Sequence, residues 1–175
     1  MINTHSNIFL VGPMGSGKST IGRILAEILD LKFIDLDCEI EERCGANISW
    51  IFDMEGEDGF RKRESRMLAE LASGTGMVLA TGGGAVIFEE NRNVLKNSGY
   101  VVYLSAPVGQ LLERTSHDRS RPLLNVSNPR EVLKQLVLDR ELLYQEIADL
   151  VFVTSKRKPW LVANEIANEV RQFVG

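Results

Sequence analysis

The sequence has few cysteines and prolines and lacks any long apolar run. Only two of its 175 residues are cysteine and five are proline. Cys38 and Cys44 form neither a CxxC pair nor a zinc-binding pattern, so we interpret both as reduced thiols with a structural role. No apolar stretch approaches the ~18 residues of a membrane span, and residues 1–6 lack the basic start and apolar core of a signal peptide. We therefore expect a cytoplasmic protein without a membrane partner.

An excess of basic residues is also absent. Lysine and arginine total 20 against 24 acidic residues, and the resulting net charge of −4 argues against a nucleic acid as the main partner. His5 and His117 have neither a nucleophile nor a metal-binding pattern nearby, and we expect both at the surface. The length, the 44% share of hydrophobic residues and the lack of repeats predict one globular domain over residues 1–175.

A glycine-rich stretch at residues 12–20 gives the strongest functional signal. It is GPMGSGKST, which fits G-x-x-x-x-G-K-[ST] at every fixed position, whereas an ordinary glycine-rich turn would rarely do so. An apolar run at 7–11 predicts a strand before it, and helical spacing of apolar residues predicts a helix after it. In such a loop Lys18 would reach the β- and γ-phosphates of a nucleotide, and the Ser19 hydroxyl would ligate Mg2+. The predicted phosphate-binding residues are Gly15, Ser16, Gly17, Lys18, Ser19 and Thr20.

Two carboxylates lie at the end of a second predicted strand, residues 32–37. Asp35 and Asp37 are two residues apart, so on a strand they project to the same face. Open α/β sheets bind ligands at the carboxyl ends of their strands. One carboxylate could hold a metal through water while the other accepts a hydroxyl hydrogen bond or takes its proton. The alternative is a helix N-cap followed by a solvated acid, because residues 38–43 have a helical pattern.

A third predicted strand, residues 77–81, ends in three consecutive glycines, Gly82, Gly83 and Gly84. Many P-loop enzymes place a metal-binding aspartate at such a strand end, and this sequence has none there. The glycines would instead leave backbone N–H groups open to close approach by a ligand, although a flexible turn is the alternative. Asp35 is then the best candidate for the carboxylate that binds the metal.

Two arginines occupy unfavourable positions on predicted helices. Arg61 is placed in the first turn of a helix at 57–73, which follows a short helix at 48–54, and a cation there opposes the helix dipole. Arg140 falls on the apolar stripe of a long helix that starts at 129, where a charge is costly unless paired. A helical arginine is most often solvated, but Arg140 must either form an ion pair or face a ligand carboxylate.

Residues 114–127 have few helix or strand signals and several arginines, including Arg114 and Arg121. We interpret them as a basic lid that closes over bound nucleotide, expels water and brings an arginine to the transferred phosphoryl group. The alternative is an exposed loop with incidental charge. Further strands at 100–105 and 150–154 alternate with helices at 88–97, 107–116 and 159–173. Five strands alternating with helices predict an α/β fold, a three-layer α/β/α P-loop domain with a parallel sheet.

Together these motifs resemble the shikimate kinase family over nearly the whole chain. The resemblance rests on Asp35-Leu36-Asp37, on EGEDGFR at 55–61 followed by Glu64, on Thr81 with the three glycines, on RPLL at 121–124, and on Arg140 ahead of Leu143-Tyr144. It implies the nucleoside-monophosphate-kinase-like fold with sheet order 2-3-1-4-5. It also implies Mg2+-dependent transfer of the γ-phosphate of ATP to the 3-hydroxyl of shikimate, within the pathway to chorismate and the aromatic amino acids.

The resemblance also implies a role for individual residues. Asp37 would bind the ring hydroxyls and act as the base, in a substrate-binding segment at about 35–64, while Lys18 and Arg121 would neutralise charge on the transferred group. Ser19 and, through water, Asp35 would hold Mg2+. The implied substrate-binding residues are Asp37, Arg61, Gly82, Gly83, Gly84 and Arg140. The implied ATP-binding residues outside the P-loop are Arg114, Arg121, Arg157 and Pro159. The expected partners are shikimate and ATP, and the expected assembly is a monomer.

Two alternatives remain open from the residues alone. A kinase for gluconate or a nucleoside monophosphate would share the P-loop and the lid, but the paired aspartates, the three glycines and the two arginines favour a compact polyhydroxylated acid. A nucleotide-dependent binding or switch module is the other alternative. The sequence has no N-K-x-D motif, and Lys18, Asp37 and Arg121 are all present, which favours the kinase.

Overall fold

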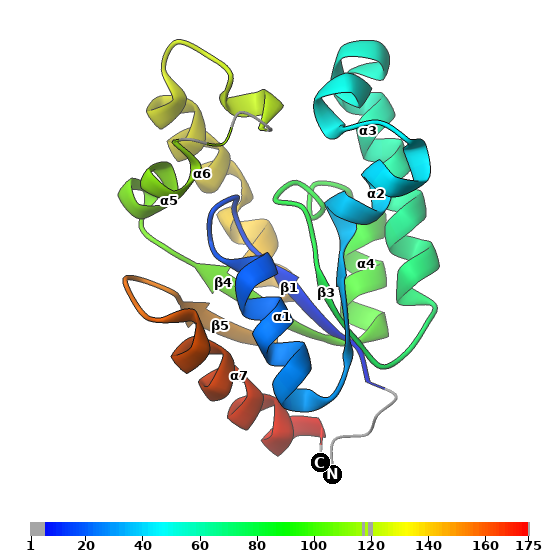
Figure 1. Ribbon diagram of the computed structural model, residues 1–175, viewed down its shortest axis with the longest axis vertical. Helices are drawn as coiled ribbons and strands as arrows, with labels where there is room; N and C mark the ends of the chain where they lie inside the picture. The colour runs from blue at the N-terminus through cyan, green and yellow to red at the C-terminus, as the bar shows by residue number, and fades with distance from the viewer. Residues whose placement is uncertain (1–5, 117, 119–120, 175) are drawn as a thin grey trace.

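The structure is a computed structural model that describes residues 6–116, 118 and 121–174, in which strands and helices alternate (Figure 1). His5 and His117, both expected at the surface, lie outside the described residues, as do residues 119–120 of the predicted lid. The strands are β1 (Ile8–Val11), β2 (Lys32–Asp35), β3 (Met77–Ala80), β4 (Tyr100–Ser105) and β5 (Leu150–Val153). The helices are α1 (Lys18–Leu29), α2 (Leu36–Cys44), α3 (Ile48–Ala72), α4 (Glu89–Ser98), α5 (Val108–Thr115), the short 3-10 helix η1 (Pro122–Leu124), α6 (Pro129–Ile147) and α7 (Pro159–Val174).

The five strands form one parallel sheet in the order β2-β3-β1-β4-β5, as predicted. The central strand β1 pairs with β3 on one side and β4 on the other, and all four of its residues are fully buried. Strands buried on both faces are continuously apolar, which explains the run Ile-Phe-Leu-Val. The placement of β1 puts the loop that follows it at the middle of the sheet's carboxyl edge.

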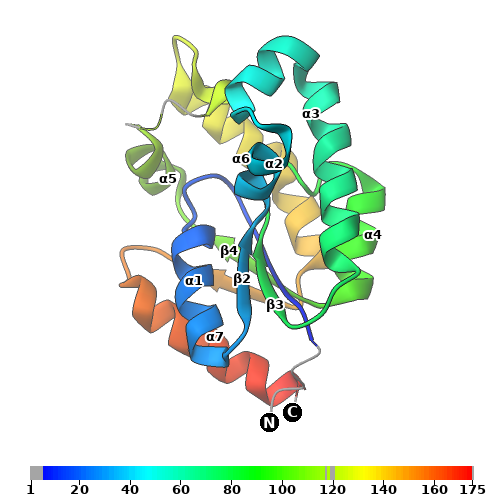
Figure 2. The same cartoon turned by 45° about the vertical axis from the view of Figure 1, so that its right-hand side comes forward.

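Helices cover both faces of the sheet (Figures 1 and 2). Helices α1 and α7 pack on the face that carries Ile8 and Leu10, whereas α3, α4 and α6 pack on the face that carries Phe9 and Tyr103. At the carboxyl edge, α2 and the first turns of α3 extend beyond the sheet, opposite η1 and the start of α6 (Figure 2). Within the described residues, no helix combines the length and apolar character needed to cross a bilayer.

Two predicted boundaries differ from the structure. The prediction that strand 2 reaches Asp37 is wrong, because β2 ends at Asp35 and Asp37 lies in the first turn of α2. The Asp35 carboxylate accepts a hydrogen bond from the Cys38 N–H at 3.1 Å and so caps this helix. Because Asp35 serves as the N-cap of α2, the strand ends there. The two predicted helices at 48–54 and 57–73 form the single element α3, which breaks at Gly56 with φ 72°.

Candidate active site

A cavity of about 700 Å3 opens at the carboxyl edge of the sheet and brings most of the predicted site residues together. Its walls come from the P-loop, the start of α2, helix α3, the loop after β3, helices α5 and α6, and η1 with Arg121 before it. The predicted residues that line it are Gly15, Gly17, Lys18, Ser19, Thr20, Asp35, Asp37, Arg61, Gly82, Gly83, Gly84, Arg114, Arg121 and Arg140. Ser16 lies in the same loop but is fully buried.

The P-loop is shaped to hold an anion. Gly12, Gly15 and Gly17 have φ values of 147°, 80° and 95°, which side-chain-bearing residues rarely adopt. Gly17 is the N-cap of α1 and provides no side-chain hydrogen bond, so the first N–H groups of α1 remain free for a ligand. The Lys18 ammonium donates to the carbonyls of Gly12 at 2.7 Å and Pro13 at 2.9 Å. Burial, together with nearby Arg121, lowers the pKa of Lys18 to about 7.

Ser19, Asp35 and Asp37 form the floor between the P-loop and α2. The Ser19 hydroxyl donates to the Asp35 carboxylate. Asp37 is half-buried, and its Oδ1 atom is buried without a hydrogen-bond partner. Burial raises the pKa of Asp37, and the neighbouring Asp35 raises it further. A buried acceptor without a partner is costly, so this carboxylate is suited to a ligand hydroxyl.

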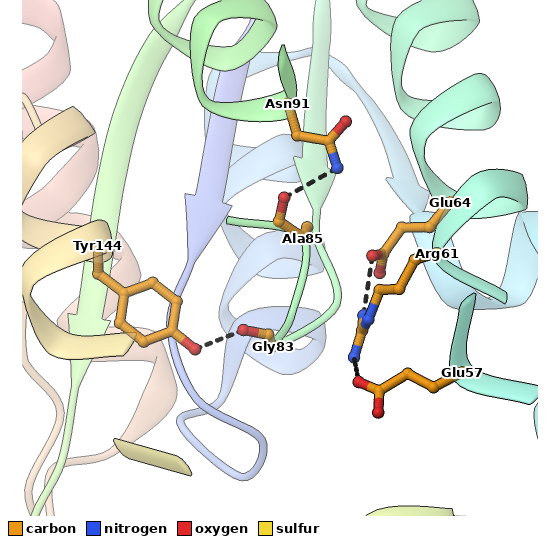
Figure 3. Close-up of polar contacts among 7 residues, drawn as sticks. All are labelled: Glu57, Arg61, Glu64, Gly83, Ala85, Asn91 and Tyr144. Carbon is orange, nitrogen blue, oxygen red and sulfur yellow. Dashed lines mark hydrogen bonds and ion pairs between the residues drawn. The ribbon is translucent and has the colours of Figure 1, made fainter. Parts of the chain in front are cut away.

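Arg61 and Arg140 approach the cavity from α3 and α6, and both are buried. Arg61 donates to Glu64 at 2.8 Å and lies 3.4 Å from Glu57 (Figure 3). Arg140 forms no ion pair with any carboxylate in the described part of the chain, so the ligand-facing alternative fits it better. The helix-dipole reason given for Arg61 is wrong, since Arg61 lies beyond the first turn after Gly56. Its burial beside Glu64 is explained by the ion pair.

Glu64 also lines the cavity. It was named among the residues of the family resemblance, but no role was predicted for it. It is fully buried, and its Oε2 atom has no hydrogen-bond partner. Burial raises its pKa, and the neighbouring Arg61 offsets only part of this rise. Its spacing of three from Arg61 on a helix was the available signal, because such residues face each other. Burial could not be inferred from that spacing.

The loop after β3 passes so close to the charged groups that side chains would not fit. A Cβ on Gly82 would lie 2.8 Å from Glu64 Oε2 and 2.9 Å from Asp37 Oδ1. A Cβ on Gly84 would lie 2.5 Å from the Cζ atom of Arg61. All three distances are shorter than real Cβ contacts. At Gly82 and Gly84 a side chain would therefore displace these charged groups, and neither glycine has a left-handed backbone.

The predicted lid contributes Arg121, which lines the cavity and pairs with Asp118 at 3.0 Å. Arg114 donates to the Gly15 carbonyl at 2.9 Å and lies over the P-loop. Two predicted ATP-binding residues lie elsewhere. Arg157 pairs with Glu165 on α7, Pro159 begins that helix, and neither lines the cavity.

Comparison with known proteins identifies the relatives of this chain. The family model for shikimate kinase matches residues 14–174. The chain belongs to the shikimate kinase family. A curated shikimate kinase of Pseudomonas aeruginosa (strain LESB58) is 57% identical over 167 residues, covering 95% of this chain and 97% of its own. The structure of shikimate kinase from Acinetobacter baumannii in complex with shikimate superposes with a TM-score of 0.95 at 48% identity, covering 97% of this chain and 95% of the other.

The shikimate kinase family was the one predicted from the motifs, and these findings confirm it, together with the kinase activity and fold. A gluconokinase from Sinorhizobium meliloti also superposes, with a TM-score of 0.58 at 16% identity over 98% of this chain and 94% of the other. Likeness at that identity shows only a shared fold. The comparisons therefore favour shikimate kinase over the gluconate alternative.

Proposed function

We propose that this protein transfers the γ-phosphate of ATP to the 3-hydroxyl of shikimate and releases shikimate 3-phosphate and ADP. The observation that carries the proposal is one cavity that joins the P-loop to Asp37, Arg61 and Arg140. A phosphate cradle at one end and a carboxylate with two arginines at the other match a nucleotide and a small hydroxylated acid. Family membership favours the same reaction.

In this proposal the arginines recognise the shikimate carboxylate. Arg140 has no carboxylate ion-pair partner among the described residues, and a guanidinium binds a ligand carboxylate through two parallel hydrogen bonds. Arg61 presents its guanidinium beside Gly84, where no Cβ intervenes. The backbone of Gly82, Gly83 and Gly84 would lie against the bound acid.

Asp37 would accept hydrogen bonds from the ring hydroxyls and take the proton of the attacking hydroxyl. Burial raises the pKa of this carboxyl, which makes the carboxylate a better proton acceptor than an exposed aspartate. As the hydroxyl oxygen bonds to the γ-phosphorus, the bond to the β-phosphate oxygen breaks and ADP leaves. Lys18 and Arg121 would neutralise charge on the phosphoryl group, and alignment supplies most of the acceleration.

We propose that Mg2+ is held by Ser19 and, through water, by Asp35. Their oxygen atoms contact each other beside the P-loop, and oxygen is the donor atom that Mg2+ prefers. Within the described residues, no cluster of three or more His, Cys, Asp or Glu side chains could hold a metal by itself. This fits an ion held mainly by nucleotide phosphates with one or two protein oxygens. When bound, Mg2+ would neutralise phosphate charge during transfer.

We also propose that the enzyme acts in the cytoplasm as a monomer. For the adenine of ATP, we propose contacts with Arg114, already above the P-loop, and with Arg157 and Pro159 after a local rearrangement. The pairing of Arg157 with Glu165 would have to change for that contact to form.

The experiment that tests the reaction measures ADP release by the purified protein with ATP and Mg2+. Four arms contain no acceptor, shikimate, gluconate or AMP. Release in the shikimate arm alone supports the proposed reaction. Release with another acceptor would keep the kinase and reject shikimate as the substrate. No release, with ATP still bound, would favour a nucleotide-binding module.

A further inference from the structure

The Gly82–Gly84 loop has no side chains with which to fix its own position, yet it lies among the charges of the site. A peptide without side chains must be held by hydrogen bonds to its backbone. The Gly83 carbonyl accepts a hydrogen bond of 2.5 Å from the Tyr144 hydroxyl (Figure 3). Tyr144 and Gly83 are 61 residues apart, so this bond joins α6 to the loop after β3.

Other side chains hold the segment that follows the loop. Asn91 donates from α4 to the Ala85 carbonyl at 3.0 Å, as Figure 3 shows. Arg92 donates to the carbonyls of Val86 and Ile87, both at 2.9 Å. These bonds anchor the exit of the loop, whereas Tyr144 holds its centre.

Tyr144 is itself held rigidly. It is fully buried, and its ring stacks on Tyr103 of β4 with a centroid distance of 5.0 Å and an interplanar angle of 24°. The Tyr103 hydroxyl donates instead to Glu141 at 2.7 Å. Burial raises the pKa of Tyr144 to about 12, so its hydroxyl keeps its proton and remains a donor at neutral pH.

The same face of α6 also carries Arg140. Residues four apart on a helix are neighbours, and the Arg140 guanidinium lies beside the Tyr144 hydroxyl. A Cβ on Gly83 would lie 3.6 Å from a terminal nitrogen of Arg140, so the loop also borders this arginine. Tyr144 therefore touches both the loop and the cation proposed to bind the shikimate carboxylate.

We propose that Tyr144 is a positioning residue for shikimate, because its hydroxyl fixes the Gly83 peptide relative to Arg140 and Arg61. This inference rests on the proposed function, since it assigns a role within the same acceptor site. Tyr144 would not touch shikimate itself. Its hydroxyl acts on Gly83 and Arg140, not on the reacting atoms. Its loss should weaken acceptor binding and leave nucleotide binding almost unchanged.

The test compares Tyr144→Phe with Tyr103→Phe. Each substitution removes one hydroxyl from the same aromatic stack, but only the first removes a contact with the loop. Leaving the buried Gly83 carbonyl without its donor should raise the KM for shikimate about tenfold in Tyr144→Phe. The KM for ATP should stay within about twofold, and Tyr103→Phe should keep both values. An unchanged KM for shikimate, or an equal rise in both variants, would overturn the inference.

A second measurement covers the case in which Tyr144→Phe is unstable. The increase in Tm produced by saturating shikimate is measured relative to the ligand-free Tm of each variant, because a ligand stabilises the folded state that binds it. We expect a smaller increase in Tyr144→Phe than in Tyr103→Phe, and equal increases would contradict the inference. Shikimate-dependent ADP release by the unmodified protein is measured first. If the unmodified protein shows no shikimate-dependent ADP release, the proposed reaction is rejected. If it does, but shikimate raises the Tm of both variants equally, only the role of Tyr144 is rejected.

Discussion

Arg61 and Glu64 form a buried ion pair at 2.8 Å, and the second buried arginine of the cavity, Arg140, has no such carboxylate partner in the described part of the chain. The two arginines proposed to bind the shikimate carboxylate therefore differ in their ion pairing when no ligand is bound. Arg61 forms an ion pair with Glu64, whereas the buried Arg140 forms none with the described residues and acts on Glu64 only from a longer distance. Substituting them should therefore have different consequences for stability, even if both weaken shikimate binding.

Arg61→Ala and Arg140→Ala should each raise the KM for shikimate by about 30-fold or more, since loss of one partner of a buried charged contact costs ~2–5 kcal/mol. Only Arg61→Ala should also lower the Tm of the ligand-free protein, because it leaves Glu64 buried without its ion-pair partner. Steady-state kinetics and thermal melts of both variants check this. Unchanged shikimate kinetics in both would reject the assignment of the carboxylate site, and equal Tm values would reject the asymmetry.

Asp37→Asn should lose mainly kcat. The amide keeps the size of the carboxylate and can still form hydrogen bonds, but it cannot take a proton. In the unmodified protein the pKa of Asp37 is raised, and the base is active only when deprotonated. As the pH is lowered, kcat should therefore begin to fall at a higher pH than it would with an aspartate of ordinary pKa. This loss of kcat at acidic pH should be absent in Asp37→Asn. A normal kcat in Asp37→Asn would remove its role as base.

The lowered pKa of Lys18 predicts a loss of catalytic efficiency on the alkaline side of the pH profile. Its pKa is about 7 in the ligand-free protein, and only the protonated form attracts phosphates. The kcat/KM for ATP should decline as the pH rises above about 7, since this parameter reports the free enzyme. The kcat at saturating ATP should persist to higher pH because bound phosphates favour the charged ammonium. Parallel declines in both parameters would contradict this explanation.

The same lowered pKa gives a prediction for stability. The unfolded chain keeps Lys18 protonated up to its ordinary pKa of 10.5, whereas the folded chain releases the proton near pH 7. The unfolded state thus binds more protons between these values, and the contribution of Lys18 to the free energy of unfolding rises with pH across this window. Lys18→Met should remove that rise, raise the ligand-free Tm at neutral pH and abolish ATP binding. Thermal melts from pH 6 to 9 with about 0.5-unit steps, with and without ATP, measure all three.

Features that depend on residues close together in the sequence could be predicted from it. The P-loop motif predicted a loop with its strand and helix, and all five strands were predicted at nearly the right positions. Continuous apolar runs mark the buried strands β1, β3 and β4, because strands buried on both faces are apolar throughout. The position of Arg140 on an apolar stripe correctly indicated a buried cation. The strand boundary at Asp35 was not predicted, since strand continuation and N-capping both suit that residue and the contact with Cys38 N–H decides between them.

Contacts between distant segments could not be predicted from local patterns. The bond from Tyr144 to Gly83 joins residues 61 positions apart, and nothing in either stretch indicates the other. The pairing of Arg157 with Glu165 on α7 likewise depends on how the preceding loop folds. The burial of Glu64 depends on the approach of the Gly82–Gly84 loop, which only the packed structure shows.

Asp35 is proposed to serve both the metal and the helix, and two substitutions can separate these roles. Asparagine keeps an oxygen that can cap α2 at Cys38 but loses the negative charge, whereas alanine loses both. Asp35→Asn should therefore keep nearly the original Tm and need a severalfold higher Mg2+ concentration for half-maximal activity. Asp35→Ala should show the same Mg2+ requirement and in addition lose about 1 kcal/mol of stability. Chelation of Mg2+ should stop ADP release in all three proteins, and an unchanged Mg2+ requirement in Asp35→Asn would place the metal elsewhere.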